Sequence, residues 1–119
     1  MLQIHAGTAV LNQTPLDWDG NTARIREAIA GARARGVTLL CLPELCITGY
    51  GCEDAFQSPD VQRLALECLQ EILPDTGGMV VSLGLPLVFR NAIYNVAALV
   101  ADGSILGFAA KQNLAGDGI

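Results

Sequence analysis

Apolar and polar residues occur in separate blocks along the chain, and the spacing within each block predicts alternating strands and helices. The apolar run 2–11 predicts a first strand, and the polar stretch 12–21 predicts the loop that follows it. Residues 37–42 are apolar except for Thr38 and too few for a helix, which predicts a parallel strand buried on both faces. Four apolar residues between these two segments recur at helical spacing: Ile25, Ala28, Ile29 and Ala32. The first unit is therefore strand, helix and strand, which implies a parallel pair with a right-handed crossover.

A second helix is expected after position 58. Ser58 suits the N-cap position and Pro59 the first helical position, where a missing N–H group costs nothing. The apolar face of this helix consists of Val61, Leu64, Ala65, Cys68, Leu69 and Ile72. Pro74 is expected to end it, because proline cannot donate the hydrogen bond that a continuing helix needs.

The last third of the chain predicts antiparallel strands. Residues 79–83 form a third buried strand, and a loop around Pro86 follows. The apolar runs 93–100 and 105–110 are separated by Asp-Gly at 102–103, which is a strong hairpin signal. The sheet is thus expected to be mixed, parallel at first and then antiparallel, which places the chain in the α/β class.

Composition and charge exclude several classes of protein. With 119 residues, of which 51% are hydrophobic, the chain can form the core of one small domain. The net charge of −5 and the absence of a stretch of basic residues argue against a nucleic-acid partner. No apolar run approaches the roughly 20 residues of a membrane span, and the first residues lack the charged start of a signal peptide. The sequence therefore predicts a cytoplasmic protein that has no membrane partner.

The four cysteines do not form a recognisable metal or disulfide pattern. They stand at positions 41, 46, 52 and 68, without a CxxC pair, and the chain has only one histidine. Metal ligation is not expected from this spacing. Cys41, within the strand 37–42, and Cys68, on the apolar helix face, are expected to be reduced and buried.

Glu44 and Lys111 are the residues with the best prospects for chemistry. Glu44 follows the strand 37–42, at the edge where ligands bind in open α/β sheets, and Lys111 directly follows the run 105–110. A carboxylate and an ammonium at neighbouring strand ends form a charge pair that can serve catalysis. Other readings stay open: the pair can be a plain salt bridge that closes the sheet edge, and Glu44 can be a solvated loop glutamate or one that caps nearby backbone amides.

Three segments carry a resemblance to a known family: LNQTPLDWDGN at 11–21, LPELCITGYGCEDAF at 42–56, and YNVAALVADGSILGFAAKQNLAGDGI at 94–119. They resemble the nitrilase, or carbon-nitrogen hydrolase, superfamily, and within it the glutamine-hydrolysing domain of glutamine-dependent NAD synthetases. The resemblance implies a four-layer αββα sandwich. Residues 1–119 would form its amino-terminal portion, with a mixed sheet and helices on one face, and without the synthetase domain.

The family resemblance also implies a Glu, Lys, Cys triad. Glu44 would be the general base, Lys111 would stabilise the oxyanion, and Tyr50 would line the substrate pocket. The nucleophilic cysteine of the family lies on a later strand, so none of the four cysteines takes that role. The 119 residues alone are therefore expected to be inactive. The tail at 112–119, with Gly116 and Gly118, is expected to be a cut loop without a phosphate-binding motif.

The implied activity is glutamine amide hydrolysis, which supplies ammonia for ATP-dependent NAD synthesis from nicotinate adenine dinucleotide. Glutamine, a carboxyl-terminal synthetase domain and further copies in a homo-oligomer are the implied partners. No cofactor or metal is expected in this segment, and ATP and Mg²⁺ are implied for the synthetase domain. Two rival hypotheses stay open: a stand-alone nitrilase-like amidase, and a non-catalytic binding or assembly module that kept the fold.

Overall fold

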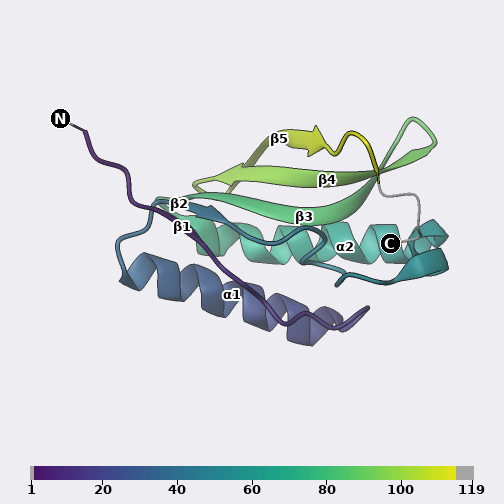
Figure 1. Cartoon of the computed structure of the whole chain (residues 1–119), viewed down its shortest axis with the longest axis horizontal. Coiled ribbons are helices and arrows are strands. Elements are labelled where there is room, and N and C mark those ends of the chain that lie inside the picture. The colour runs from purple at the N-terminus through teal and green to yellow at the C-terminus, as the bar shows by residue number, and fades with distance from the viewer. Residues whose placement is uncertain (1, 115–119) are drawn as a thin grey trace.

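Two α-helices lie under one face of a five-stranded sheet in the computed structural model, which describes residues 2–114 (Figure 1). The elements are β1 (Ala6–Thr8), α1 (Trp18–Ala34), β2 (Leu39–Cys41), a 3₁₀ helix (Glu53–Gln57), α2 (Pro59–Ile72), a second 3₁₀ helix (Leu73–Thr76), β3 (Val80–Phe89), β4 (Ala92–Ala101) and β5 (Ser104–Ala110). The strand order is β1-β2-β3-β4-β5, parallel between the first three strands and antiparallel afterwards. The prediction of a mixed sheet is confirmed.

The first strand is much shorter than the apolar run 2–11 predicted. Only Ala6–Thr8 pairs with β2, and the apolar side chains Leu2 and Val10 on either side of it are each 97% exposed. A strand extends only as far as its neighbour offers backbone partners, and β2 is itself three residues long. The length of β1 therefore follows from pairing and not from its own hydrophobicity.

Both predicted helices are confirmed. The side chains of Ile25 and Ile29 on α1 are fully buried, and the Asp17 carboxylate caps the helix by accepting a bond from the Gly20 N–H. α2 begins at Pro59 and ends at Ile72. Ser58 stands at its N-cap position, but its side chain makes no capping bond. Together with the inner face of the sheet, the two apolar helix faces form the core.

The prediction that the strand 37–42 is buried on both faces is wrong. In β2 the side chain of Leu40 is 2% exposed, whereas Leu39 is 42% exposed and Cys41 is also exposed. The helices cover only one face of the sheet, so alternate residues of β2 point away from the core (Figure 1). The expectation of a buried thiol is therefore wrong for Cys41 and confirmed for Cys68.

The predicted loop around Pro86 is also wrong, because Pro86 lies inside β3, which continues to Phe89. Proline is tolerated in a strand only where no neighbour needs its missing N–H group. β2 pairs with β3 no further than Ser82, so at Pro86 β3 pairs with β4 alone, opposite Asn95. The free edge that proline requires is created by the short length of β2.

The hairpin predicted at 102–103 is confirmed. Asp102 and Gly103 both have positive φ, +50° and +81°, which is the conformation of a tight turn between antiparallel strands. Arg90 and Asn91 adopt the same conformation, with φ of +50° and +62°, and join β3 to β4. None of the helices within residues 2–114 is both long and apolar enough to cross a membrane. Gly116 and Gly118 lie outside the described residues.

Candidate active site

Glu44 and Lys111, 67 residues apart in the sequence, meet above one face of the sheet. The Lys111 ammonium donates a hydrogen bond from Nζ to Glu44 Oε1 over 2.7 Å. Asn95 donates to the same oxygen from Nδ2 over 2.6 Å. The structure therefore brings together the two residues that the sequence singled out, and it adds a third that the sequence analysis missed.

The register of the hairpin places Lys111 and Asn95 side by side. Val96 pairs with Ala110, and one position further the Lys111 N–H donates to the Asn95 carbonyl over 2.8 Å. Residues opposite each other in an antiparallel ladder project from the same face of the sheet. That face is the one not covered by α1 and α2, and we call it the open face.

The segment that carries Glu44 crosses β3 at Gly84. Beyond β2, the Leu42 N–H donates to the Ser82 carbonyl over 3.0 Å, and the Ile47 N–H donates to the Gly84 carbonyl over 3.1 Å. A Cβ atom at Gly84 would stand 2.2 Å from Leu45 N and 2.9 Å from Glu44 C. Only glycine leaves room for the backbone on either side of Glu44 to lie this close to the strand.

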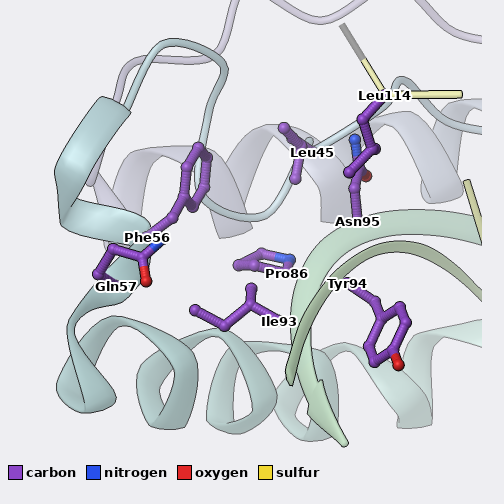
Figure 2. Close-up of a pocket in the computed structure, with 8 residues that line it drawn as sticks. All are labelled: Leu45, Phe56, Gln57, Pro86, Ile93, Tyr94, Asn95 and Leu114. Atoms are coloured by element: carbon purple, nitrogen blue, oxygen red, sulfur yellow. The ribbon is translucent and has the colours of Figure 1, made fainter. Parts of the chain in front are cut away.

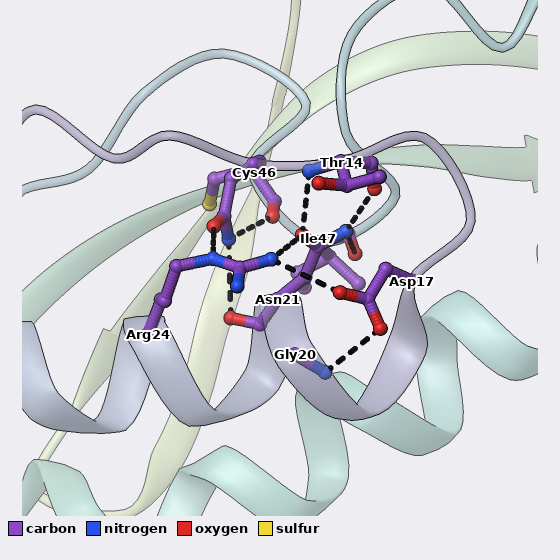
Figure 3. A network of polar contacts seen from close by, with 8 residues as sticks. Thr14, Asp17, Gly20, Asn21, Arg24, Cys46 and Ile47 are labelled. Carbon is purple, nitrogen blue, oxygen red and sulfur yellow. Dashed lines mark hydrogen bonds and ion pairs between the residues drawn. The ribbon is translucent and has the colours of Figure 1, made fainter.

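A buried polar network holds the far side of the same segment (Figure 3). The side chain of Asn21 is fully buried and donates from Nδ2 to the carbonyls of Thr14, over 2.8 Å, and Ile47, over 3.3 Å. Gln13 donates from Nε2 to the Cys46 carbonyl over 2.8 Å. Carbonyl groups two and three residues after Glu44 are therefore tied to the first helix and to the loop before it.

Arg24 of α1 links the members of this network. Its guanidinium donates to Gln13 Oε1 over 2.7 Å, to Asn21 Oδ1 over 2.8 Å and to Asp17 over 3.3 Å (Figure 3). Burial removes hydrogen bonds between these acceptors and water, and the guanidinium replaces them. Among the described residues, no buried side-chain nitrogen or oxygen lacks a hydrogen-bond partner. The network thus makes the path of the Glu44 segment well defined.

Hydrogen bonding keeps Glu44 and Lys111 oppositely charged. The bond from Lys111 has the largest effect and lowers the pKa of the Glu44 carboxyl. Desolvation raises this pKa by less, and the bond from Asn95 makes a still smaller contribution that lowers it. The same bond raises the pKa of Lys111. The two side chains are 37% and 36% exposed, so water screens their attraction and the pair adds little to stability. Its arrangement is therefore more informative about chemistry than about folding.

Two hollows adjoin Asn95, and the charge pair lines one of them. One, of about 430 Å³ on the open face, is lined by Cys41, Glu44, Ser82 and Lys111, among other residues. The other, of about 210 Å³, is lined by Leu45, Phe56, Gln57, Pro86, Ile93, Tyr94, Asn95 and Leu114 (Figure 2). Asn95 lines both hollows and lies between them.

Tyr50 lies outside the described linings of both hollows, and its side chain is 51% exposed. It is near enough to Lys111 to make a small contribution to the raised pKa of that ammonium. Its predicted role in substrate binding stays a prediction.

The buried cysteines near Glu44 are poor nucleophiles in this structure. Burial raises the pKa of Cys46 to about 11, and it also raises the pKa of Cys52. A thiol attacks only as its thiolate, so both groups are largely inert at neutral pH. The exposed Cys41 makes no hydrogen bond with Glu44 within the described part of the chain. In residues 2–114 there is also no cluster of three His, Cys, Asp or Glu side chains that could hold a metal ion.

Asn95 could have been found from one local signal. It is an amide in the middle of the apolar run 93–100, where β propensity and packing both favour other residues. Such an exception points to a task for the side chain. Its pairing with Lys111 and its reach to Glu44 depend on register and strand order, which the local sequence does not reveal.

Gly84→Ala is expected to destabilise the protein by about 1–3 kcal/mol, because the new methyl group meets backbone atoms that cannot rotate away. The measurement is the thermal unfolding temperature of the complete protein. Gly107→Ala on β5 is the matched control, since a Cβ there meets nothing within 4 Å. Equal unfolding temperatures for the two variants would contradict the tight crossing at Gly84.

Comparisons with known proteins identify relatives of this chain. The chain is 38% identical over 120 residues to a glutamine-dependent NAD(+) synthetase of Oryza sativa subsp. indica, a match that covers 99% of this chain and 16% of that protein. The crystal structure of a glutamine-dependent NAD(+) synthetase from Cytophaga hutchinsonii superposes with a TM-score of 0.94 at 47% identity, covering 98% of this chain and 20% of that one. An amidase from Nesterenkonia sp. superposes with a TM-score of 0.80 at 25% identity, covering 95% and 44%.

The superpositions confirm the predicted α/β fold class and the resemblance noted in the sequence. The chain spans about a sixth of the length of the rice relative, so it corresponds to one part of such a protein. The carbon-nitrogen hydrolase family description matches residues 5–117, which is nearly the whole chain. This match, the two superpositions and the similarity in sequence show that the chain belongs to the carbon-nitrogen hydrolase family.

Proposed function

We propose that residues 1–119 form the amino-terminal part of a glutamine amidohydrolase domain. In this proposal the whole protein hydrolyses the side-chain amide of glutamine and supplies the ammonia for ATP-dependent NAD synthesis from nicotinate adenine dinucleotide. The observation that carries the proposal is the Glu44–Lys111 pair, 2.7 Å apart at two strand ends, in a chain that matches the carbon-nitrogen hydrolases. The similarity to NAD(+) synthetases supports the choice of glutamine as the amide substrate.

Glu44 and Lys111 would have distinct roles in this reaction. Glu44 accepts the proton of a cysteine thiol, and the thiolate attacks the amide carbon while Lys111 stabilises the resulting oxyanion. The tetrahedral intermediate then breaks its C–N bond, and Glu44 returns the proton so that ammonia leaves and a thioester forms. In the second half, Glu44 takes a proton from water and the hydroxide attacks the thioester. As the C–S bond breaks, Glu44 returns the proton to the sulfur, and glutamate and the free thiol are released. Tyr50 would contact the bound substrate.

The nucleophile in this scheme is none of the four cysteines of the chain. We expect the polypeptide of residues 1–119 alone to release no ammonia from glutamine above the uncatalysed rate. The measurement is an ammonia assay on this polypeptide, with its circular dichroism recorded to show that the helices have formed. Ammonia release that disappears when Cys41 or Cys46 is alkylated would contradict the prediction.

The partners and cofactors of the whole protein belong to the same proposal. We propose glutamine as substrate, a carboxyl-terminal synthetase domain as acceptor of the ammonia, and assembly into a homo-oligomer. ATP and Mg²⁺ would act in the synthetase domain. Within residues 2–114, no cluster of three His, Cys, Asp or Glu side chains is suited to a metal ion.

The test of the proposal is ammonia release by the complete protein. Equimolar ammonia and glutamate from glutamine, with NAD formed when ATP and nicotinate adenine dinucleotide are present, is the expected result. Hydrolysis of small aliphatic amides without NAD formation would instead favour a stand-alone amidase, the activity named for the Nesterenkonia structure. If no amide is hydrolysed, the proposal fails and the non-catalytic module is favoured.

A further inference from the structure

The side chain of Asn95 is not explained by the needs of the sheet. Its carbonyl already accepts the Lys111 N–H over 2.8 Å, and its position pairs with Pro86 on the other side. Asparagine is disfavoured in strands, and the rest of the run 93–100 is apolar apart from Tyr94. The amide therefore has a role outside the backbone ladder.

The hydrogen bonds of Glu44 indicate that role. Asn95 Nδ2 and Lys111 Nζ both donate to Oε1, over 2.6 Å and 2.7 Å, and within residues 2–114 no hydrogen bond reaches Oε2. Because both donors stand at neighbouring positions of the β4–β5 ladder, the carboxylate cannot rotate without breaking two bonds. We propose that Asn95 is a positioning residue which, with Lys111, holds Oε1 of Glu44 and so presents Oε2 as the oxygen that accepts the proton.

This inference rests on the proposed function, and it assigns different roles to the two donors, Lys111 and Asn95. The ammonium group of Lys111 can also turn towards an oxyanion during the reaction. The neutral amide of Asn95 keeps its hold on Oε1 when Lys111 does so. The carboxylate thus stays oriented through both halves of the reaction, which a single donor could not ensure.

The groups around Glu44 determine how its pKa should change when Asn95 is replaced. Lys111 is the ammonium that faces it, and the Cys41 thiol lines the same hollow from β2. Tyr50 makes a small contribution to the pKa of Lys111. Lys111 has the largest lowering effect on the pKa of Glu44, and the bond from Asn95 adds to it. Removal of the Asn95 amide should therefore raise the pKa of Glu44 as well as free its rotation.

The experiment compares Asn95→Leu with the wild type in the complete protein. Leucine has a similar size but no donor, so kcat for ammonia release should fall roughly 10- to 100-fold, as expected for a misplaced catalytic group. KM should change little, and the acidic limb of the kcat/KM profile should move to higher pH. Asn95→Asp keeps the shape but adds a second carboxylate, and it should move that limb further in the same direction. Leu99→Ala, four positions away on the same face of β4, is the control for a general disturbance of the strand.

Two outcomes would overturn the role of Asn95. One is a wild-type pH profile in both Asn95 variants, and the other is an equal loss of kcat in Leu99→Ala. If the wild type itself hydrolyses no glutamine, the proposed function has failed, but Asn95 is still tested by the ¹³C NMR titration of the Glu44 carboxyl carbon. A midpoint that rises in Asn95→Leu supports the hold on Oε1, and an unchanged midpoint refutes it.

Discussion

Replacement of Glu44 by glutamine is expected to reduce ammonia release from glutamine by about 10²–10⁴-fold, the usual contribution of a general base. Glutamine has the same shape and its Oε1 can still accept the bonds from Lys111 and Asn95, but it cannot take up a proton. The measurement is kcat for ammonia release by the complete protein. Because the Glu44 side chain is 37% exposed, the unfolding temperature should stay close to that of the wild type.

Glu27→Gln provides a matched control for this variant. Glu27 is exposed on α1, on the side of the sheet opposite the charge pair, and forms no ion pair or side-chain hydrogen bond among the described residues. The same chemical change there should leave kcat unaltered. Full activity in Glu44→Gln would mean that the pair is only a salt bridge at the sheet edge.

Replacement of Lys111 by methionine is expected to lower kcat by about 10²–10³-fold, the loss seen when one oxyanion donor is removed. Methionine keeps most of the length of the side chain but has neither charge nor donor. Lys111 is also the largest cause of the lowered pKa of Glu44, so that pKa should rise. Activity that needs the Glu44 carboxylate is lost as pH falls through this pKa. The acidic limb of kcat/KM should therefore move to higher pH in the variant.

Arg63→Met tests whether the loss of any surface cation would have this effect. Arg63 lies on α2 and forms exposed ion pairs with Asp60 and Glu67. Its replacement should leave both kcat and the pH profile unchanged, since exposed pairs contribute little. A Lys111→Met variant that keeps wild-type kcat would exclude Lys111 from the chemistry.

Much of the fold could be predicted because local patterns decide it. The spacing of Ile25 and Ile29 predicts the buried face of α1, and the turn at 102–103 predicts the β4–β5 hairpin. In each case the residues that determine the element are close in sequence. The conformational preferences of neighbouring residues are then enough to select the structure.

The errors arose where a residue responds to a neighbour that is distant in sequence. Pro86 was expected in a loop, yet it lies in β3 because β2 ends early and leaves that edge unpaired. Leu39 and Cys41 were expected to be buried, yet they lie on the open face. An apolar run shows that a strand is hydrophobic, but it does not show which of its faces another layer covers.

By itself, the sequence determined the order of the strands and helices and identified Glu44 and Lys111 as polar groups just beyond two apolar strands. Only the tertiary structure decided that Lys111 donates to Oε1 of Glu44 and that Asn95 is a second donor to the same oxygen. It also decided that Gly84 leaves room for the segment that carries Glu44. The physical reason is that each of these contacts joins different elements. Strand order and hairpin register set their distances, and both result from the packing of the whole sheet.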